Sequence, residues 1–158
     1  MAKHQERTLV IIKPDAVVRG LAGEVLKRFE RKGFRIVGMK FGHLTEDLLI
    51  EHYAHLKDKP FFPAIVKFMT SAPSIMLVIE GKNVVAAVRA MAGVTDAAEA
   101  LPGTIRGDFA LSIQQNVVHV SENLAAAEQE VPRFFKENEL IEYDRADISA
   151  IYSVDELT

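Results

Sequence analysis

Four short apolar runs with strand character, separated by segments of helical spacing, constrain the fold more than any other feature of this chain. Three of the runs cover residues 7–12, 34–41 and 74–80, and the fourth surrounds residue 119. Segments with helical patterns lie between or after these runs, at 24–32, 45–56, 64–69, 83–92 and 122–130. The order along the chain is strand, helix, strand, two helices, strand, helix, long loop, strand and helix.

This order contains the unit βαββαβ, once the extra helix and the long loop are treated as insertions. It predicts an α+β fold of the ferredoxin-like type, with a four-stranded antiparallel sheet and helices packed on it. The sequence has no internal repeats, low-complexity segments or linker. We therefore expect one domain over residues 1–158, because a chain of this length buries roughly 70% of its unfolded surface.

The composition excludes several classes of protein. The chain has no cysteine, so disulfides, thiol catalysis and cysteine-based zinc sites are absent. Its net charge is −3, which argues against nucleic-acid binding as the main function. No run approaches the ~18 consecutive apolar residues of a membrane span, and residues 1–7 are polar rather than signal-like. We expect a cytoplasmic protein that does not enter a membrane.

The stretch 102–123 carries the clearest candidate for chemistry. It begins as a loop in which Arg106 lies between Gly103 and Gly107, and it ends in an apolar run interrupted by His119. The glycines allow the backbone to approach a ligand closely, and an arginine fork matches phosphate oxygens. A buried strand has little structural use for an imidazole. On residue types alone, however, a structural histidine satisfied by hydrogen bonds is the commoner case.

Three further candidates lie in loops or at the edges of elements, namely Lys13, Arg89 and Thr95. The side chains of Lys13 and Arg89 can instead extend along their aliphatic stems and place their charges in solvent. The sequence has no G-x-G-x-x-G after a strand, no phosphate loop of the G-x-x-x-x-G-K-[ST] type and no H-E-x-x-H. Scattered cations with one histidine suit phosphoryl transfer through the imidazole, which is a good nucleophile near neutral pH.

Two other features have competing interpretations. His52 and His55 are three residues apart and could meet on one helix face as metal ligands. Nothing nearby completes such a site, so a solvated polar face is the favoured interpretation. The adjacent Phe61 and Phe62 are typical of core residues, although one of them on a surface lip would offer a stacking platform.

Ten short motifs, spread over nearly the whole chain, resemble those of the nucleoside diphosphate kinase family. They are Arg7-Thr8, Ile12-Lys13-Pro14-Asp15, Arg19-Gly20-Leu21, Gly23-Glu24, Lys32-Gly33-Phe34, His52-Tyr53, Lys59-Pro60-Phe61-Phe62, Glu80-Gly81, Pro102-Gly103-Thr104-Ile105-Arg106-Gly107-Asp108-Phe109 and Asn116-x-x-His119-x-Ser121. The last two are highly specific when they occur together and in this order.

The resemblance implies a ping-pong enzyme that moves the γ-phosphate of a nucleoside triphosphate, typically ATP, to a nucleoside diphosphate. His119 would be the nucleophile and would carry the phosphoryl group on Nδ1. Glu130 would orient His119, and Ser121 would bond Glu130 in turn. Tyr53 would form a hydrogen bond near the histidine and the transferring group.

The resemblance also assigns nucleotide contacts. Lys13 would contact the β- and γ-phosphates and the sugar 3′-hydroxyl, which Asn116 would share. Three residues would hold phosphates, namely Arg89, Thr95 and Arg106. Phe61 would stack on the base, with Ile113 as the opposite wall. Such stacking implies that the enzyme accepts nucleotides with different bases, because every base has a π-face.

The resemblance further implies Mg²⁺ as cofactor, held mainly by the nucleotide phosphates, so no metal ligand is expected from the chain. The expected partners are nucleoside tri- and diphosphates and further copies of the chain, in a homo-oligomer for which a hexamer is favoured over a tetramer. The alternative function is a nucleotide-binding regulatory module of the same fold with weak or lost turnover.

The sequence departs from the family pattern beside the nucleophile. The family motif usually continues His-Gly or His-Ala and then Ser-Asp, whereas this chain has Val120 and Glu122 at the two variable positions. A β-branched residue lowers activity if this position needs an unusual backbone conformation. Glu122 keeps the charge with a longer reach, which affects any water-mediated Mg²⁺ contact. Neither change removes a group that does the chemistry, so we expect an active enzyme, whose rate is reduced if position 120 needs the smaller residue.

Overall fold

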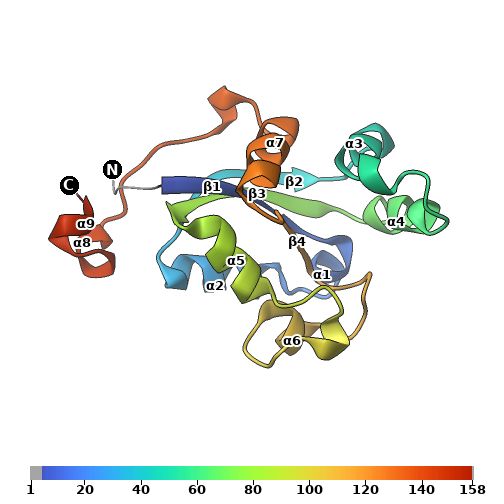
Figure 1. Ribbon diagram of the computed structural model, residues 1–158, viewed down its shortest axis with the longest axis horizontal. Coiled ribbons are helices and arrows are strands. Elements are labelled where there is room, and N and C mark those ends of the chain that lie inside the picture. Colours follow the sequence, from blue (N-terminus) through green and yellow to red (C-terminus); the bar gives the residue numbers. More distant parts are fainter. Residues whose placement is uncertain (1–4, 158) are drawn as a thin grey trace.

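A computed structural model describes residues 5–157, which form a four-stranded antiparallel sheet with helices on both faces (Figure 1). The strands are β1 (Gln5–Ile12), β2 (Arg35–Gly42), β3 (Ser74–Lys82) and β4 (Val118–Val120). They lie in the order β2-β3-β1-β4, and each neighbouring pair is antiparallel. The expected α+β fold and its four-stranded sheet are thus confirmed.

Within residues 5–157, the α-helices follow the predicted order with four additions. The helices are α1 (Pro14–Val18), α2 (Ala22–Lys32), α3 (Glu46–His52), α4 (Phe62–Met69), α5 (Val84–Ala92), α6 (Ile105–Phe109), α7 (Leu124–Phe134), α8 (Ile148–Ile151) and α9 (Val154–Leu157). The additions are α1, α6, α8 and α9. Short 3₁₀ turns cover Ala54–Leu56, Ala97–Glu99 and Glu137–Glu139. None of the helices within the described part of the chain is long and apolar enough to cross a membrane.

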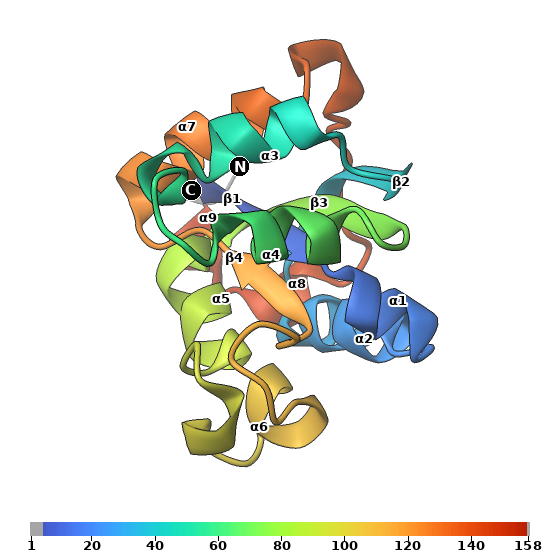
Figure 2. The same ribbon diagram turned by 90° about the vertical axis from the view of Figure 1, so that its right-hand side faces the viewer.

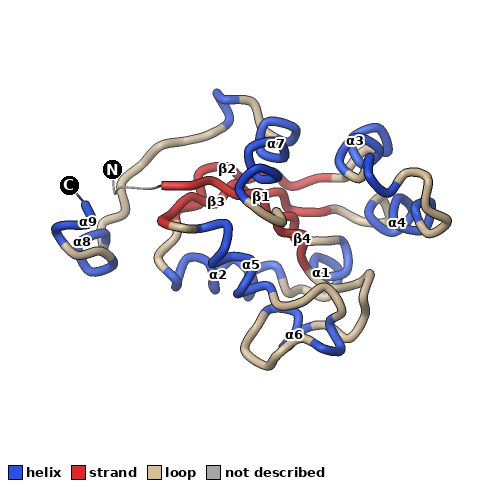
Figure 3. The backbone as a smooth tube through the Cα atoms, viewed as in Figure 1, coloured by secondary structure: helices blue, strands red, loops and turns tan. Residues whose placement is uncertain are grey.

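Helices lie on both faces of the sheet (Figure 3), and the alternating side chains of β1 enter one hydrophobic core on each face. Val10 and Ile12 point to the face covered by α2 and α5, where they join the larger cluster with Phe29 of α2. Leu9 and Ile11 point to the opposite face, which α3, α4 and α7 cover. The alternation follows from the period of two in a strand, since successive side chains face opposite ways.

The loop expected around Arg106 contains a helix that the sequence analysis did not predict. Thr104 is its N-cap, and the side-chain oxygen of Thr104 accepts the backbone N–H of Gly107 at 3.0 Å. A Cβ atom at Gly107 would lie 2.0 Å from the carbonyl oxygen of Leu101. The glycine is therefore needed for contact between two parts of this loop, rather than for the approach of a ligand.

The register of β4 decides which way His119 points. His119 pairs with Ile11, whereas Val118 and Val120 pair with Ile12 and Val10. Because paired residues share a face, His119 points to the side of α3 and α7, and the two valines enter the opposite core. Figure 2 shows β4 at the end of the sheet, between α4 on one side and α5 with α6 on the other.

Candidate active site

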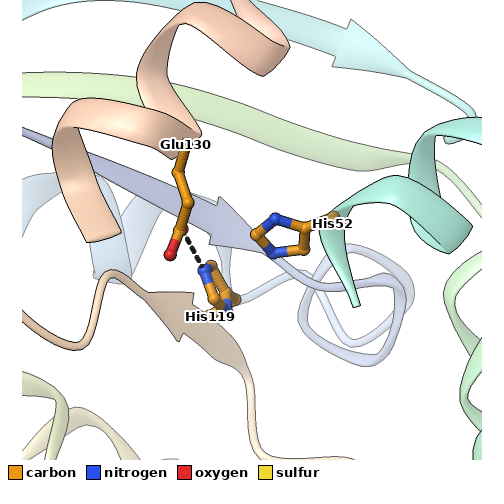
Figure 4. A group of neighbouring side chains, drawn as sticks. All are labelled: His52, His119 and Glu130. Atoms are coloured by element: carbon orange, nitrogen blue, oxygen red, sulfur yellow. Dashed lines mark hydrogen bonds and ion pairs between the residues drawn. The ribbon is translucent and has the colours of Figure 1, made fainter. Parts of the chain in front are cut away.

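His119 is held at one ring nitrogen by a carboxylate from α7. Its Nε2 lies 2.7 Å from Oε2 of Glu130 (Figure 4), and the Ser121 hydroxyl lies 3.4 Å from the same oxygen. The Ser121 hydroxyl also accepts the backbone N–H of Leu9 at 3.2 Å, which ties this group to β1. The hydrogen bond to Glu130 places the Nε2 proton, so Nδ1 is the nitrogen left with a free lone pair.

His52 packs against this pair, contrary to the expected solvated polar face. It is 6% exposed, and its ring meets the ring of His119 edge to face with centroids 4.5 Å apart. Its Nδ1 accepts from Arg133 at 3.3 Å, and its Nε2 has no hydrogen-bond partner among the described residues. The position three residues after the buried Leu49 was the sequence signal for this burial.

His52, His119 and Glu130 place one potential metal-ligating atom each within 4.8 Å of one another. The surrounding charges oppose a cation there. Burial, followed by the positive charges of groups that include Arg133 and Lys13, lowers the pKa of His52 to about 2. His52 is therefore a neutral side chain that restricts the ring of the neighbouring histidine.

A cavity of about 480 Å³ lies in front of His119. It is lined by nine of the eleven residues that the sequence analysis singled out for the site: Lys13, Tyr53, Phe61, Arg89, Thr95, Arg106, Ile113, Asn116 and His119. The other two, Ser121 and Glu130, lie behind His119 and are buried. No carboxylate lines the cavity among the described residues, whereas three cations do. The cavity therefore suits a phosphorylated ligand.

Lys13 leaves the end of β1 and reaches across the cavity floor. Its Nζ donates to Oδ1 of Asn116 at 2.7 Å and to the carbonyl of Gln114 at 3.3 Å. Burial, together with the charge of Arg106, lowers the pKa of Lys13 to about 8. The amide nitrogen of Asn116 in turn donates to the carbonyl of Thr95 at 3.0 Å. Lys13 therefore holds a proton that it can lose just above neutral pH.

Arg106 belongs to α6. Its guanidinium group binds the protein backbone, a contact that the sequence analysis did not predict. Its two terminal nitrogens donate to the carbonyls of Gly93 at 2.8 Å and Val118 at 2.7 Å. Its Nε has no partner among the described residues. Burial, together with the charge of Arg89, lowers the pKa of Arg106 to about 10, which leaves the side chain charged near neutral pH. Arg106 thus joins β4 to the 93–106 loop and keeps a positive charge at the cavity.

Two exposed apolar residues, Phe61 and Ile113, contribute to the lip of the cavity. Phe61 is 51% exposed and Ile113 is 63% exposed, although both line the cavity. The neighbouring Phe62 is buried, so the pair of phenylalanines divides into one lip residue and one core residue. Exposed apolar groups at a mouth lined by cations suit a ligand with a flat apolar end and a charged end.

His119 remains neutral near pH 7. Burial lowers the pKa of His119, and the hydrogen bond to Glu130 opposes that shift without reversing it. The charges of Lys13 and Arg106 lower it further. A neutral imidazole is the nucleophilic form, so the lowered pKa favours the reactive form of the ring.

Val120 does not need the conformation that would penalise a β-branched residue. It belongs to β4, is 6% exposed and packs in the core below the sheet. Among residues 5–157, the non-glycine residues with positive φ are Asn83 and Val117, not Val120. Glu122 is exposed and does not line the cavity in front of His119. Backbone strain at Val120 therefore gives no reason to expect a reduced rate.

Comparisons with known proteins identify the family of this chain. A family model described as nucleoside diphosphate kinase matches residues 6–140. Nucleoside diphosphate kinase B of Canis lupus familiaris is 51% identical over 149 residues, which cover 94% of this chain and 98% of that protein. Nucleoside diphosphate kinase A of Homo sapiens is 50% identical over 147 residues, or 93% of this chain and 97% of that one.

Two solved structures extend the similarity to three dimensions. The nucleoside diphosphate kinase of Halobacterium salinarum, solved in complex with CDP, superposes with a TM-score of 0.92 at 45% identity, covering 95% of this chain and all of that one. The enzyme of Borrelia burgdorferi, solved as a transition-state mimic with vanadate and ADP, gives 0.86 at 37% identity, covering 92% and 96%. The match in sequence and fold leads to one conclusion: the chain belongs to the nucleoside diphosphate kinase family.

Proposed function

We propose that His119 is the residue through which this kinase moves a phosphoryl group from a nucleoside triphosphate to a nucleoside diphosphate. The observation that carries the proposal is the engagement of Nε2 by Glu130 at 2.7 Å on a ring that lines a cationic cavity. That hydrogen bond holds the tautomer in which Nδ1 is unprotonated.

The two half-reactions use the same atoms in opposite directions. In the first, the Nδ1 lone pair of His119 attacks the γ-phosphorus while the bond from that phosphorus to the β,γ-bridging oxygen breaks. The diphosphate leaves with the electron pair, and the ring gains positive charge that Glu130 stabilises through Nε2–H. In the second, a diphosphate oxygen attacks the phosphohistidine, and the electron pair of the P–N bond returns to Nδ1.

The cations of the cavity hold the transferring group. Lys13 and Arg106 lie close enough to His119 to lower its pKa, so their charges also act on a phosphate at that position. Arg89 is exposed at the rim and meets the phosphates nearer the base, together with Thr95. Lys13 and Asn116 bind the sugar 3′-hydroxyl and the phosphates, and the Tyr53 hydroxyl stands near the histidine. Positioning and positive charge account for most of the acceleration in such transfers.

The lip residues Phe61 and Ile113 hold the base between two apolar surfaces, without reading its hydrogen-bonding edge. Stacking of this kind tolerates every base. Mg²⁺ is the cation that fits, because the described lining offers it no carboxylate and phosphate oxygens are the ligands it prefers. When bound with the nucleotide, it would neutralise phosphate charge.

The exposed apolar residues favour assembly of several copies, and we assign the assembly to the cytoplasm because the sequence has no cysteine. On the edge strand β2, Met39 is 54% exposed and Phe41 is 68% exposed, and Leu111 beside the cavity loop is 87% exposed. Open strand edges and apolar patches of this kind are usually covered by a partner. We favour a hexamer over a tetramer, and light scattering that measures four chains of 17.5 kDa rather than six would exclude it.

Labelling tests the proposal directly. Incubation with γ-³²P-ATP and Mg²⁺ should place acid-labile, base-stable label on the protein, and added GDP should remove that label as GTP. These stabilities are those of a phosphohistidine rather than a phosphoserine. ATP binding without any label would instead support a nucleotide-binding module that has lost turnover.

Glu130→Gln should slow phosphoryl transfer by about tenfold to hundredfold, since it removes a charged hydrogen-bond partner of the ring. Glu130 does not line the cavity, so the ATP concentration for half-saturation should stay nearly unchanged. Rapid-quench measurement of His119 labelling separates the two quantities. Glu128→Gln is the matched control, because Glu128 is an exposed glutamate of the same helix. Equal rates in both variants would contradict the role of Glu130.

A further inference from the structure

Val117 has a backbone conformation that a valine rarely adopts. Its φ is +75°, and it is fully buried two residues before His119. The backbone N–H of Val118 donates to the carbonyl of Asn116 at 2.9 Å, which closes a γ-turn centred on Val117. For a β-branched residue, this region of φ is a genuine outlier and persists only where the surroundings enforce it.

The side-chain hydrogen bond to the backbone of Val117 comes from Asp15, at the start of α1. Oδ2 of Asp15 accepts the Val117 N–H at 3.0 Å, and the backbone N–H of Lys13 donates to the Val117 carbonyl at 2.8 Å. Asp15 is 6% exposed, and its Oδ1 has no hydrogen-bond partner among the described residues. Burying a carboxylate with one oxygen unsatisfied is unfavourable, so packing alone does not account for Asp15.

The turn joins two parts of the site. Asn116 precedes it and accepts from Lys13 Nζ at 2.7 Å, and β4 with His119 follows it. A relaxed φ at Val117 would rotate the Asn116 side chain and the start of β4 relative to each other. Asp15 itself does not line the cavity in front of His119, so it has no direct contact with a nucleotide there.

We propose that Asp15 is a positioning residue, which holds the strained turn at Val117 and thereby sets Asn116 and His119 in the arrangement that phosphoryl transfer needs. This inference rests on the proposed function. It adds a carboxylate that acts on the reaction through the backbone rather than through the substrate.

A second route for Asp15 must be separated from this one. Burial lowers the pKa of Lys13, and the carboxylate of Asp15 opposes that shift. Removal of Asp15 would therefore also weaken the charge on Lys13. Glycine at position 117 distinguishes the two routes, since glycine adopts positive φ without strain but cannot restore a charge.

The test is a double-mutant cycle with Asp15→Ala and Val117→Gly, read as the first-order rate of His119 labelling by saturating Mg-ATP. D15A should slow labelling by about tenfold or more in the wild-type background, and by about threefold or less in the V117G background. The loss of the buried valine side chain does not affect the comparison, because V117G and the double variant D15A/V117G both lack that side chain and only the ratio of their rates is used. Half-saturation by ATP should shift by less than about twofold.

Controls keep the outcome specific. Asp108→Ala removes another carboxylate that accepts a backbone N–H, here that of Gly103 at 2.8 Å, and should show no coupling to V117G. If D15A does not fold, Asp15→Asn replaces it, with a smaller loss because its amide oxygen still accepts. Circular dichroism gives the folded fraction to which each rate is normalised.

Equal slowing by D15A in both backgrounds would overturn the inference, as would a loss confined to ATP affinity or to the melting temperature. Either result leaves the proposed function intact, because wild-type labelling is measured in the same experiment. Absence of label on the wild type would instead reject the proposed function.

Discussion

His119→Ala should abolish labelling by γ-³²P-ATP and lower the exchange of phosphate between ATP and GDP by at least about 10⁴-fold. The reason is the loss of the Nδ1 lone pair, for which the described lining offers no substitute at the same place. Cations alone can bind the nucleotide, but they cannot carry a phosphoryl group between two half-reactions. A direct transfer between two nucleotides would need both of them in one cavity of about 480 Å³.

The variant should still bind nucleotide, since the phosphate-holding cations and the stacking lip remain. Equilibrium binding of ADP is the measurement that separates lost chemistry from lost folding. His43→Ala is the matched control, because His43 is exposed on the loop after β2 and away from the cavity. Label that persisted in H119A and disappeared in H43A would reject the assignment of the nucleophile.

Lys13→Met should lower kcat/KM for Mg-ATP by about 100-fold, which is the usual loss when one preorganised donor to a developing charge is removed. Methionine approximates the length of the stem and removes the ammonium group. The hydrogen bond to Asn116 is lost with it, so part of the effect reaches the reaction through that side chain. Lys59→Met is the control, as Lys59 is exposed and does not line the cavity.

Lys13 should also determine how the free enzyme responds to alkaline pH. Its pKa of about 8 means that the ammonium loses its proton as the pH rises through that value. In the wild type, kcat/KM should therefore fall above pH 8 and approach a tenfold loss per pH unit. The variant K13M lacks the titrating group, so its profile should be flat over the same interval. A wild-type profile that is flat to pH 10 would contradict the assignment.

Local sequence patterns accounted for much of the fold. The continuous apolar run within 7–12 places Val10 and Ile12 in one core and Leu9 and Ile11 in the other, because successive side chains of a strand face opposite ways and both faces of this sheet are buried. The helical pattern predicted at 45–56 begins at Thr45, a residue type typical of N-caps, and the Thr45 side chain accepts the backbone N–H of Leu48. These features depend on residues close together in the chain, so the sequence alone is sufficient.

The site was harder to predict, since its parts meet only through tertiary packing. The pairing of His119 with Glu130 and the nucleotide contacts were proposed from the family motifs, not from spacing. His52 was misassigned because its spacing from Leu49 places it on the inner side of α3 but does not show that α7 and β4 cover it there. Arg106 was expected to serve phosphates, yet two of its nitrogens bind backbone carbonyls of residues far from it in the chain.

The sequence by itself determined the strand and helix order, the antiparallel α+β class and, through its motifs, the histidine at the centre of the chemistry. Each of these can be inferred from the local periodicity of apolar residues or from short motifs of neighbouring residues. The tertiary structure alone decided that Asp15 reaches Val117, that Val117 takes a positive φ, and that His52 packs on His119. These contacts join residues separated by many positions, and their geometry is set by how the helices dock on the two faces of the sheet.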